Sequence, residues 1–239
     1  MTPTARGQRS LHDAATVLES WEAAARVPAA LRGVAVLAAV HPAGDAVLDL
    51  PLAEVAVLAT ERLAEMSRDE VDGVLECADC GLLLDVHVRL SDLFADPGAT
   101  EPSRDTDFRI RPPTPLDLAV AAGQSDTRGV LLRRCVTQAD GTAVDPAALR
   151  PAELADIDDA LESLAGPALP VLRAACPSCG GMAAGSVDVA DLLWQHVAVE
   201  AGVVLRDVAR LAAAFGWREP DVLTLSPLRR AAYLALAAR

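Results

Sequence analysis

Four of the five cysteines stand in two Cys-x-x-Cys-Gly motifs. The first pair is Cys77 and Cys80, and the second is Cys176 and Cys179. Zinc prefers tetrahedral coordination by soft thiolates, and two intervening residues let one tight turn direct both sulfurs at a metal. The glycine after each pair lets that turn reverse at positive φ. The spacing therefore predicts one structural zinc ion held by these four cysteines, with no coordination position left for water.

Two other interpretations of the cysteine pairs stay open at this point. A thioredoxin-like redox pair begins a helix after a buried strand, whereas strand-like residues flank both motifs here. The cysteines can also be unliganded residues of the core. Disulfides are the least favoured use, because thiols stay reduced in the cytoplasm, where the composition places this chain.

The remaining cysteine and the histidines carry weaker signals. Cys135 has apolar neighbours on an expected helix and is interpreted as a small core residue. His87 is expected to be an ordinary strand residue, because four sulfurs already complete a zinc shell. His12, His41 and His196 have neither metal-ligand nor catalytic-triad spacing.

Motifs that would support catalysis are missing from the sequence. The chain contains no lysine, so a phosphate-binding loop with its lysine is excluded. Neither a His-Glu-x-x-His helix nor a Gly-x-Ser-x-Gly turn is present. The aspartates at positions 156, 158 and 159 are interpreted as a solvated helix face. The sequence therefore favours a protein that is not an enzyme.

Composition narrows the classes of partner. The 239 residues are 52% hydrophobic and only 3% aromatic, and 34 acidic residues against 21 basic ones give a net charge of −13. This charge disfavours nucleic acid and anionic membrane surfaces as partners. No apolar run approaches the ~20 residues of a membrane span, and the first residues lack an apolar signal core. We therefore expect a cytoplasmic location.

The elements that must position the cysteines are expected to be mainly helical. Apolar spacing and capping residues predict helices over 8–26, 28–40, 52–66, 114–123, 126–136, 151–164, 188–215 and 226–238. Strand-like segments cover 71–76, 82–90 and 171–175, and 96–107 reads as an exposed loop.

The expected fold class is mainly α with a small zinc-ribbon-like β element, whose two knuckles are brought together across a helical insertion. The corresponding regions are 1–70 (N-terminal helices), 71–95 (first knuckle and hairpin), 96–168 (loop and helical insertion), 169–187 (second knuckle) and 188–239 (C-terminal helices).

The C-terminal region combines residue types that dominate protein interfaces. Arg229 and Arg230 follow a Ser-Pro helix start and are expected to pair with the carboxylates of Glu219 and Asp221. One interpretation is that this cluster fastens two terminal helices together, and the other is that it docks a partner. The docking set would be Trp217, Glu219, Arg229, Arg230 and Tyr233.

Several stretches in a fixed order resemble one family. They are 76–81, 111–118, 131–135, 176–180, 215–219 and 223–234, and together they span roughly residues 50 to 237. The most specific part is Gly-Trp-x-Glu followed by Leu-Ser-x-x-Arg-Arg-x-x-Tyr-Leu. This order resembles the baseplate hub assembly proteins of contractile-tailed phages and their relatives in bacterial contractile injection systems. The resemblance implies a non-enzymatic role in building the baseplate, with baseplate, hub or spike proteins as partners.

Two alternative functions are also consistent with the sequence. A zinc-ribbon adaptor or regulator in another multiprotein complex would use the same metal site. A redox enzyme would instead use one cysteine pair for disulfide exchange.

Overall fold

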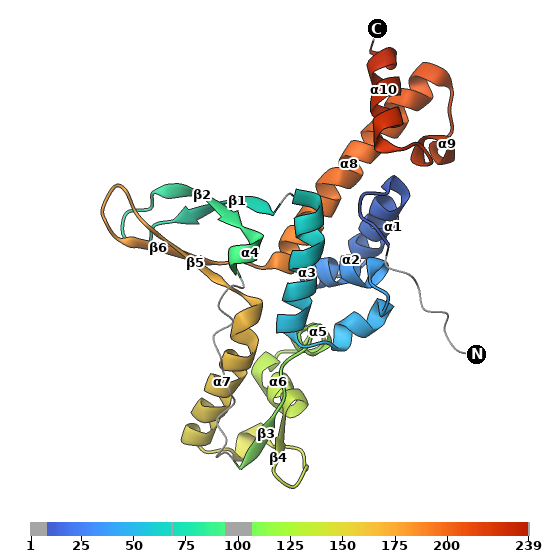
Figure 1. The fold of residues 1–239 in the computed structure, drawn as a ribbon. Helices are drawn as coiled ribbons and strands as arrows, with labels where there is room; N and C mark the ends of the chain where they lie inside the picture. Colours follow the sequence, from blue (N-terminus) through green and yellow to red (C-terminus); the bar gives the residue numbers. More distant parts are fainter. Residues whose placement is uncertain (1–8, 68, 94–106, 239) are drawn as a thin grey trace, which may run out of the picture. The chain divides into compact units, whose positions relative to one another are not determined.

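The computed structural model describes residues 9–67, 69–93 and 107–238, which form a mainly helical chain with three short two-stranded antiparallel sheets (Figure 1). The helices are α1 (Ala14–Ala25), α2 (Arg32–Val40), α3 (Leu52–Ser67), α4 (Leu90–Leu93), α5 (Pro115–Ala122), α6 (Thr127–Cys135), α7 (Pro151–Ala165), α8 (Val189–Phe215), α9 (Glu219–Leu223) and α10 (Pro227–Ala237). The strands are β1 (Glu70–Glu76), β2 (Leu83–Arg89), β3 (Phe108–Ile110), β4 (Val136–Gln138), β5 (Val171–Ala175) and β6 (Met182–Ser186). Short 3₁₀ turns are η1 (Ala29–Leu31), η2 (Gly44–Asp49), η3 (Pro146–Ala148) and η4 (Gly166–Ala168).

This composition confirms the expected fold class of helices with a small ribbon-like β element. Most helices begin and end within a few residues of their predicted limits, with the start of α1 as the exception, and most of the predicted loop 96–107 lies outside the described residues. Segments that the sequence did not indicate are the short helices α4 and α9, the paired strands β3 and β4, and strand β6. Strands of three residues are too short to show an alternation of apolar and polar side chains, which explains why β3 and β4 were missed.

The chain divides into two units that are each described alone. The terminal unit contains the described residues up to Asp45 together with those from Asp191 onward, and the central unit runs from Ala46 to Ala190. Both ends of the chain therefore belong to one unit, which the five regions expected from the sequence did not indicate.

The terminal unit is built on α8 and the N-terminal helices. Its core joins Ala14, Val17 and Leu18 of α1 to Ala201 and Val204 of α8. The last two lie in the helix that the sequence predicted over 188–215. Helix α1 starts at residue 14, later than the sequence indicated, because the Asp13 side chain accepts a hydrogen bond from the Thr16 NH and caps it there. Helix α8 ends as predicted at Gly216, whose φ is +70°.

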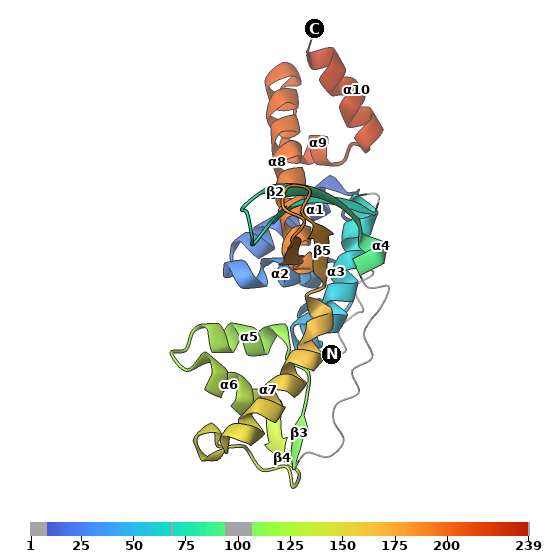
Figure 2. The ribbon, with the colours of Figure 1, turned by 90° about the vertical axis from the view of Figure 1, so that its left-hand side faces the viewer.

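The central unit has a small core between α6, β4 and α7. Leu132, Cys135, Val136, Val144 and Ile157 are buried together, and Phe108 and Ile110 of β3 pack against them. The β3–β4 sheet thus closes one side of this cluster. Figure 2 shows β3 and β4 beside α6 and α7.

Asp117 is the buried charged group that ties α5 to α6 and to the end of β3. Its side chain is 0% exposed and accepts hydrogen bonds from two arginines. Arg111 reaches the two carboxylate oxygens at 2.6 and 2.9 Å, and Arg134 of α6 reaches Oδ1 at 2.6 Å. The NH and hydroxyl of Thr114 donate at 3.0 and 3.1 Å, which completes the capping box of α5. The carboxylate is buried, but its charge is fully compensated.

These contacts determine how the Asp117 carboxyl group titrates. Burial alone would favour the neutral acid, but hydrogen bonds from Arg111, Thr114 and Arg134 outweigh it and hold the pKa of Asp117 well below its usual range. The unfolded chain, with an Asp pKa of about 4, therefore takes up this proton first as the pH falls. The stabilisation is complete above that pH and is lost progressively below about pH 4.

We predict that Asp117→Asn lowers the free energy of unfolding of the central unit by about 3 kcal/mol near pH 7. This is the lower end of the range for a broken buried ion pair, because Arg111 and Arg134 keep access to water. Urea unfolding measures the difference, which should shrink as the pH falls below about 4. Asp126→Asn, at the exposed N-cap of α6, is the control and should cost less than about 1 kcal/mol, since Asn caps as well as Asp. Equal losses in the two variants would contradict the role assigned to Asp117.

Candidate metal centre

The two cysteine pairs lie in hairpins of the same construction. Strand β1 pairs antiparallel with β2, and Glu76 opposite Leu83 is the last pair before the turn. Strand β5 pairs antiparallel with β6, and Ala175 opposite Met182 is the last pair there. Each turn between these pairs contains one Cys-x-x-Cys-Gly motif. The ribbon-type arrangement expected from the sequence is therefore present at both motifs.

Backbone hydrogen bonds close each turn into a knuckle. The NH of Cys77 donates to the Leu82 carbonyl at 2.9 Å, and the NH of Gly81 donates to the Cys77 carbonyl at 2.8 Å. The second knuckle repeats both bonds from Cys176 and Gly180, at 2.7 and 2.9 Å. The two glycines have φ values of +71° and +75°, which confirms the predicted reversal. A side chain at either position would strain the turn.

Apolar packing between the hairpins brings the knuckles together. Leu75 and Leu84 of the first hairpin are buried against Ala183 of the second, in one cluster with Cys77 and Cys176. Strands β1 and β6 lie side by side (Figure 1).

A glycine permits this close approach of the hairpins. A methyl group added to Gly185 of β6 would lie 2.8 Å from Cδ2 of Leu75, closer than carbon atoms approach. A side chain at this position would therefore force Leu75 to move.

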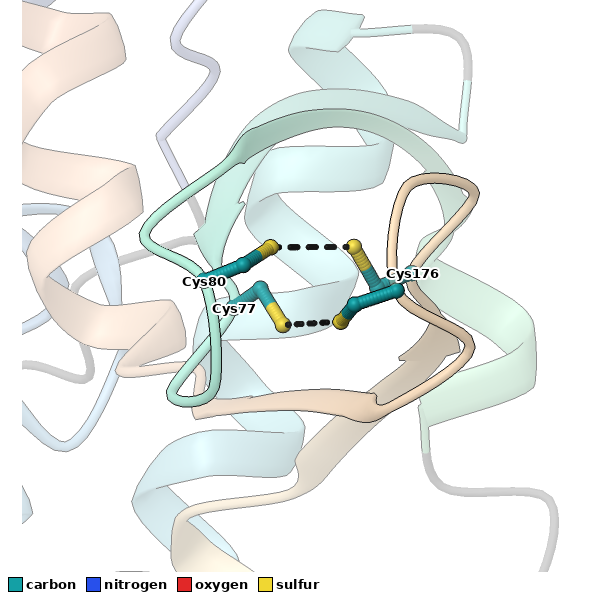
Figure 3. A group of neighbouring side chains, drawn as sticks. Cys77, Cys80 and Cys176 are labelled. Atoms are coloured by element: carbon teal, nitrogen blue, oxygen red, sulfur yellow. Dashed lines mark hydrogen bonds between the residues drawn. The ribbon is translucent and has the colours of Figure 1, made fainter.

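The four sulfurs converge between the knuckles, as Figure 3 shows. The Sγ atoms of Cys77 and Cys179 are 3.6 Å apart, as are those of Cys80 and Cys176. All four lie within 4.8 Å of one another. A tetrahedron with metal–sulfur bonds of about 2.3 Å has sulfur–sulfur edges of about 3.8 Å. The cluster thus fits one tetrahedral ion, while its separations are far longer than the ~2.05 Å of a disulfide.

Backbone donors favour thiolates at this site, whereas burial opposes them. Cys77 and Cys176 are buried, whereas Cys80 and Cys179 are exposed. A hydrogen bond from the Cys179 backbone NH lowers the pKa of Cys176 to about 7. The Gly181 NH, 3.4 Å from the Cys179 sulfur, also favours a thiolate there. Hydrogen bonding to the Cys77 and Cys80 thiols outweighs it and raises the pKa of Cys179 to about 12.

A divalent ion would resolve this competition, because it displaces the thiol protons and neutralises the crowded sulfurs. Four thiolates fill a tetrahedral shell, so an ion held by all of them has no position for a substrate or an activated water. The knuckles also lie between two strands, and not at the start of a helix where a thioredoxin-like pair would be. The geometry therefore suits a structural ion.

The other candidate ligands lie elsewhere. Cys135 is 2% exposed in the core between α6, β4 and α7, which confirms its interpretation as a core residue. Burial and the neighbouring Asp117 carboxylate raise its pKa to about 11. His87 is on β2 as predicted, opposite Asp72 of β1, and the 2.5 Å contact with that carboxylate raises its pKa.

The predicted C-terminal set is only partly a surface. Trp217 and Tyr233 pack edge to face with centroids 4.7 Å apart, and Phe215 lies 5.1 Å from Trp217. This aromatic triad joins the end of α8 to α10. Both Trp217 and Tyr233 are half-buried in it. Their side chains therefore serve the first of the two interpretations, the fastening of terminal helices.

The expected pairing of the arginines with Glu219 and Asp221 needs correction. Arg230 pairs instead with Asp207 of α8 at 3.3 Å. Asp221 accepts a hydrogen bond from the Arg218 backbone NH and caps α9, a helix that the sequence analysis did not include. Glu219 and Arg229 are exposed.

Three residues that support these sites were not predicted from the sequence. Gly185 and Asp207 carry no local signal, because each matters through a neighbour remote in the chain. The same holds for Asp117, whose partner Arg134 is 17 residues away.

Comparisons with protein-family models, with curated proteins and with solved structures give no match to this chain. Among the described helices, none joins enough length to enough apolar character to cross a membrane. What the cysteine centre can do therefore follows from its own geometry.

We predict that the purified chain binds one divalent metal ion. Elemental analysis should give one zinc per chain, and Co²⁺ in its place should give the absorption bands of a tetrahedral tetrathiolate site. Cys176→Ser should abolish these bands or weaken them strongly. Cys135→Ala, which removes a buried thiol outside the cluster, is the matched control and should keep full stoichiometry. Unchanged metal content in Cys176→Ser would contradict the site.

We also predict that Trp217→Ala loosens α10. The side chain is half-buried, so the loss is expected near 2 kcal/mol, below the cost for a fully buried aromatic residue, or roughly thirtyfold faster amide exchange in α10. Hydrogen-exchange mass spectrometry on the full chain measures it. Arg229→Ala, in the same helix but exposed, should leave the exchange nearly unchanged. An equal effect of both substitutions would argue against the triad as the fastening of α10.

Proposed function

We propose that this protein is a non-enzymatic assembly factor or minor structural component of the baseplate of a contractile, phage tail-like injection system. In this proposal one zinc ion, bound by Cys77, Cys80, Cys176 and Cys179, fixes the fold of the central unit. The observation that carries the structural role is the convergence of the four sulfurs in a shell with no open position. The particle is suggested by the resemblance of the ordered motifs between residues 50 and 237.

Zinc is proposed as the resident ion because of the donor set. Four thiolates are soft ligands, and they favour zinc over the oxygen-preferring magnesium and calcium ions. We place the protein in the cytoplasm, where thiols stay reduced and available as ligands. Iron is the competing ion for four thiolates, and the elemental analysis above distinguishes the two.

Energetics support a folding role for the ion. Cys80 and Cys176 are 96 residues apart, so bringing their segments together costs loop-closure entropy of roughly 4 kcal/mol. Structural zinc sites contribute about 10 kcal/mol or more, enough to offset that cost. A scaffold that must present fixed surfaces to other subunits benefits from such a rigid crossing point.

The test is genetic and structural. In a strain that lacks the gene, we predict that sheaths and tubes accumulate without joined baseplates, as seen by electron microscopy of cell lysates. A plasmid copy of the wild-type chain, or of Cys135→Ala, should restore complete particles, whereas Cys80→Ser with Cys179→Ser should not. Normal particles in the deletion strain would sink the proposal.

A second candidate is a zinc-ribbon adaptor in another complex, since the same knuckle geometry serves it equally. Affinity purification of the tagged, zinc-loaded chain separates the two ideas. Baseplate, spike or sheath proteins favour the first, and polymerase subunits favour the second.

A further inference from the structure

The outward face of α10 exposes large apolar side chains. None of the residues of this helix is fully buried. Leu228 is 83% exposed and Leu236 is 53% exposed. With Ala232, which is also exposed, they follow one another at intervals of four and form a stripe about 12 Å long on one side of the helix. A continuous exposed apolar stripe is typical of an interaction surface.

The opposite face of α10 explains why this stripe points away from α8. Tyr233 belongs to the aromatic triad with Phe215 and Trp217. Arg230, three residues before Tyr233, pairs with Asp207 of α8. These two anchors hold one face of α10 against α8, which Figure 2 shows alongside it. The stripe of Leu228 and Leu236 lies on the other face and is left for a partner.

Charge indicates what kind of partner fits. Helix α10 carries Arg229 and Arg230 but no carboxylate. Arg230 is neutralised by Asp207, whereas Arg229, at the edge of the stripe, is exposed and forms no ion pair within the described part of the chain. Both stand in the first turn, where the helix dipole is already positive. The stripe is therefore bordered by a local positive charge on a protein whose net charge is −13.

We propose that Leu228, Arg229, Ala232 and Leu236 form a docking face for an amphipathic helix of a partner protein, which carries a carboxylate beside its own apolar stripe. Spacing of four residues matches the anchors of helix-on-helix recognition, and Ala232 lets the two axes approach closely. Helix α10 of a second copy fits less well, because it offers no carboxylate to Arg229. The docking set expected from the sequence is thereby revised: Trp217, Arg230 and Tyr233 hold the helix, and its other face binds. This proposal rests on the proposed assembly role for its setting, but the surface exists whichever complex the protein joins.

The experiment uses the full, zinc-loaded chain and a synthetic probe. The probe is a helical peptide of about eighteen residues with leucines at intervals of three and four and glutamates flanking them. A matched peptide with arginine in place of every glutamate tests the charge. Isothermal titration calorimetry measures both affinities. We expect the acidic peptide to bind at least about tenfold more tightly than the basic one, since one paired against one repelled charge is worth that much at a partly buried contact.

Variants on surface positions keep the fold and test the face. Leu228→Gln with Leu236→Gln should abolish binding of the acidic peptide, and Arg229→Glu should reverse the preference between the two peptides. Val199→Gln, which replaces an exposed apolar residue of α8, is the control and should bind like the wild type.

Other outcomes would overturn the proposal. Absence of binding, equal binding of both peptides, or an equal loss in Val199→Gln would each do so. So would a dimer in analytical ultracentrifugation that Leu228→Gln with Leu236→Gln dissolves, since it would assign the face to a second copy. If the peptide tests fail but the deletion strain shows a baseplate defect, only the docking face is contradicted. If the peptide tests succeed but the deletion strain makes normal baseplates, only the baseplate role is contradicted.

Discussion

The convergence of two Cys-x-x-Cys turns on one point is the constraint on which the central unit depends. Two-stranded hairpins are marginal on their own in water, and both hairpins here have only two strands. The apolar cluster between them is small and includes two of the cysteines themselves. In the proposed role, metal coordination supplies the stability that a larger hydrophobic core supplies in other folds. The described elements between the knuckles, from α4 to α7, would then be tied at both ends by this crossing.

The two hairpins are alike in backbone and unlike in side chains, and the difference is what lets them pack. Where the first has Leu75 and Leu84, the second has Ala174 and Ala183 at the corresponding places before and after its knuckle. Large residues facing small ones interdigitate without voids. Gly185, which has no side chain, likewise leaves room for Leu75. A second leucine-bearing hairpin would hold the sulfurs too far apart for a shared ion.

Arginine carries most of the ion pairs among the described residues, because lysine is absent. The planar guanidinium group suits the Asp117 carboxylate. Arg111 donates hydrogen bonds to both carboxylate oxygens, and Arg134 donates one to Oδ1. The Arg230–Asp207 pair uses the same chemistry between α10 and α8. In both units, then, an ion pair between a carboxylate and an arginine joins one helix to another. The units differ in that only the central one adds a cysteine centre.

Local chemistry was readable from the sequence, and most contacts between remote segments were not. Each Cys-x-x-Cys pair, the positive φ after it, the Thr114 cap of α5 and the end of α8 at Gly216 depend on residues within about one turn of each other, so residue type and spacing determine them. The convergence of the two remote cysteine pairs was also predicted, because two matching ligand pairs together complete one tetrahedral shell. The β3–β4 pairing, the pairing of Arg230 with Asp207 and the burial of Asp117 depend on partners brought close only by folding. The same holds for α10: the sequence predicted the helix, but only the packing of Tyr233 and Arg230 decided which of its faces is turned to solvent. Which remote residues come into contact depends on how all the elements pack together. The pattern of residues along the chain does not show this packing.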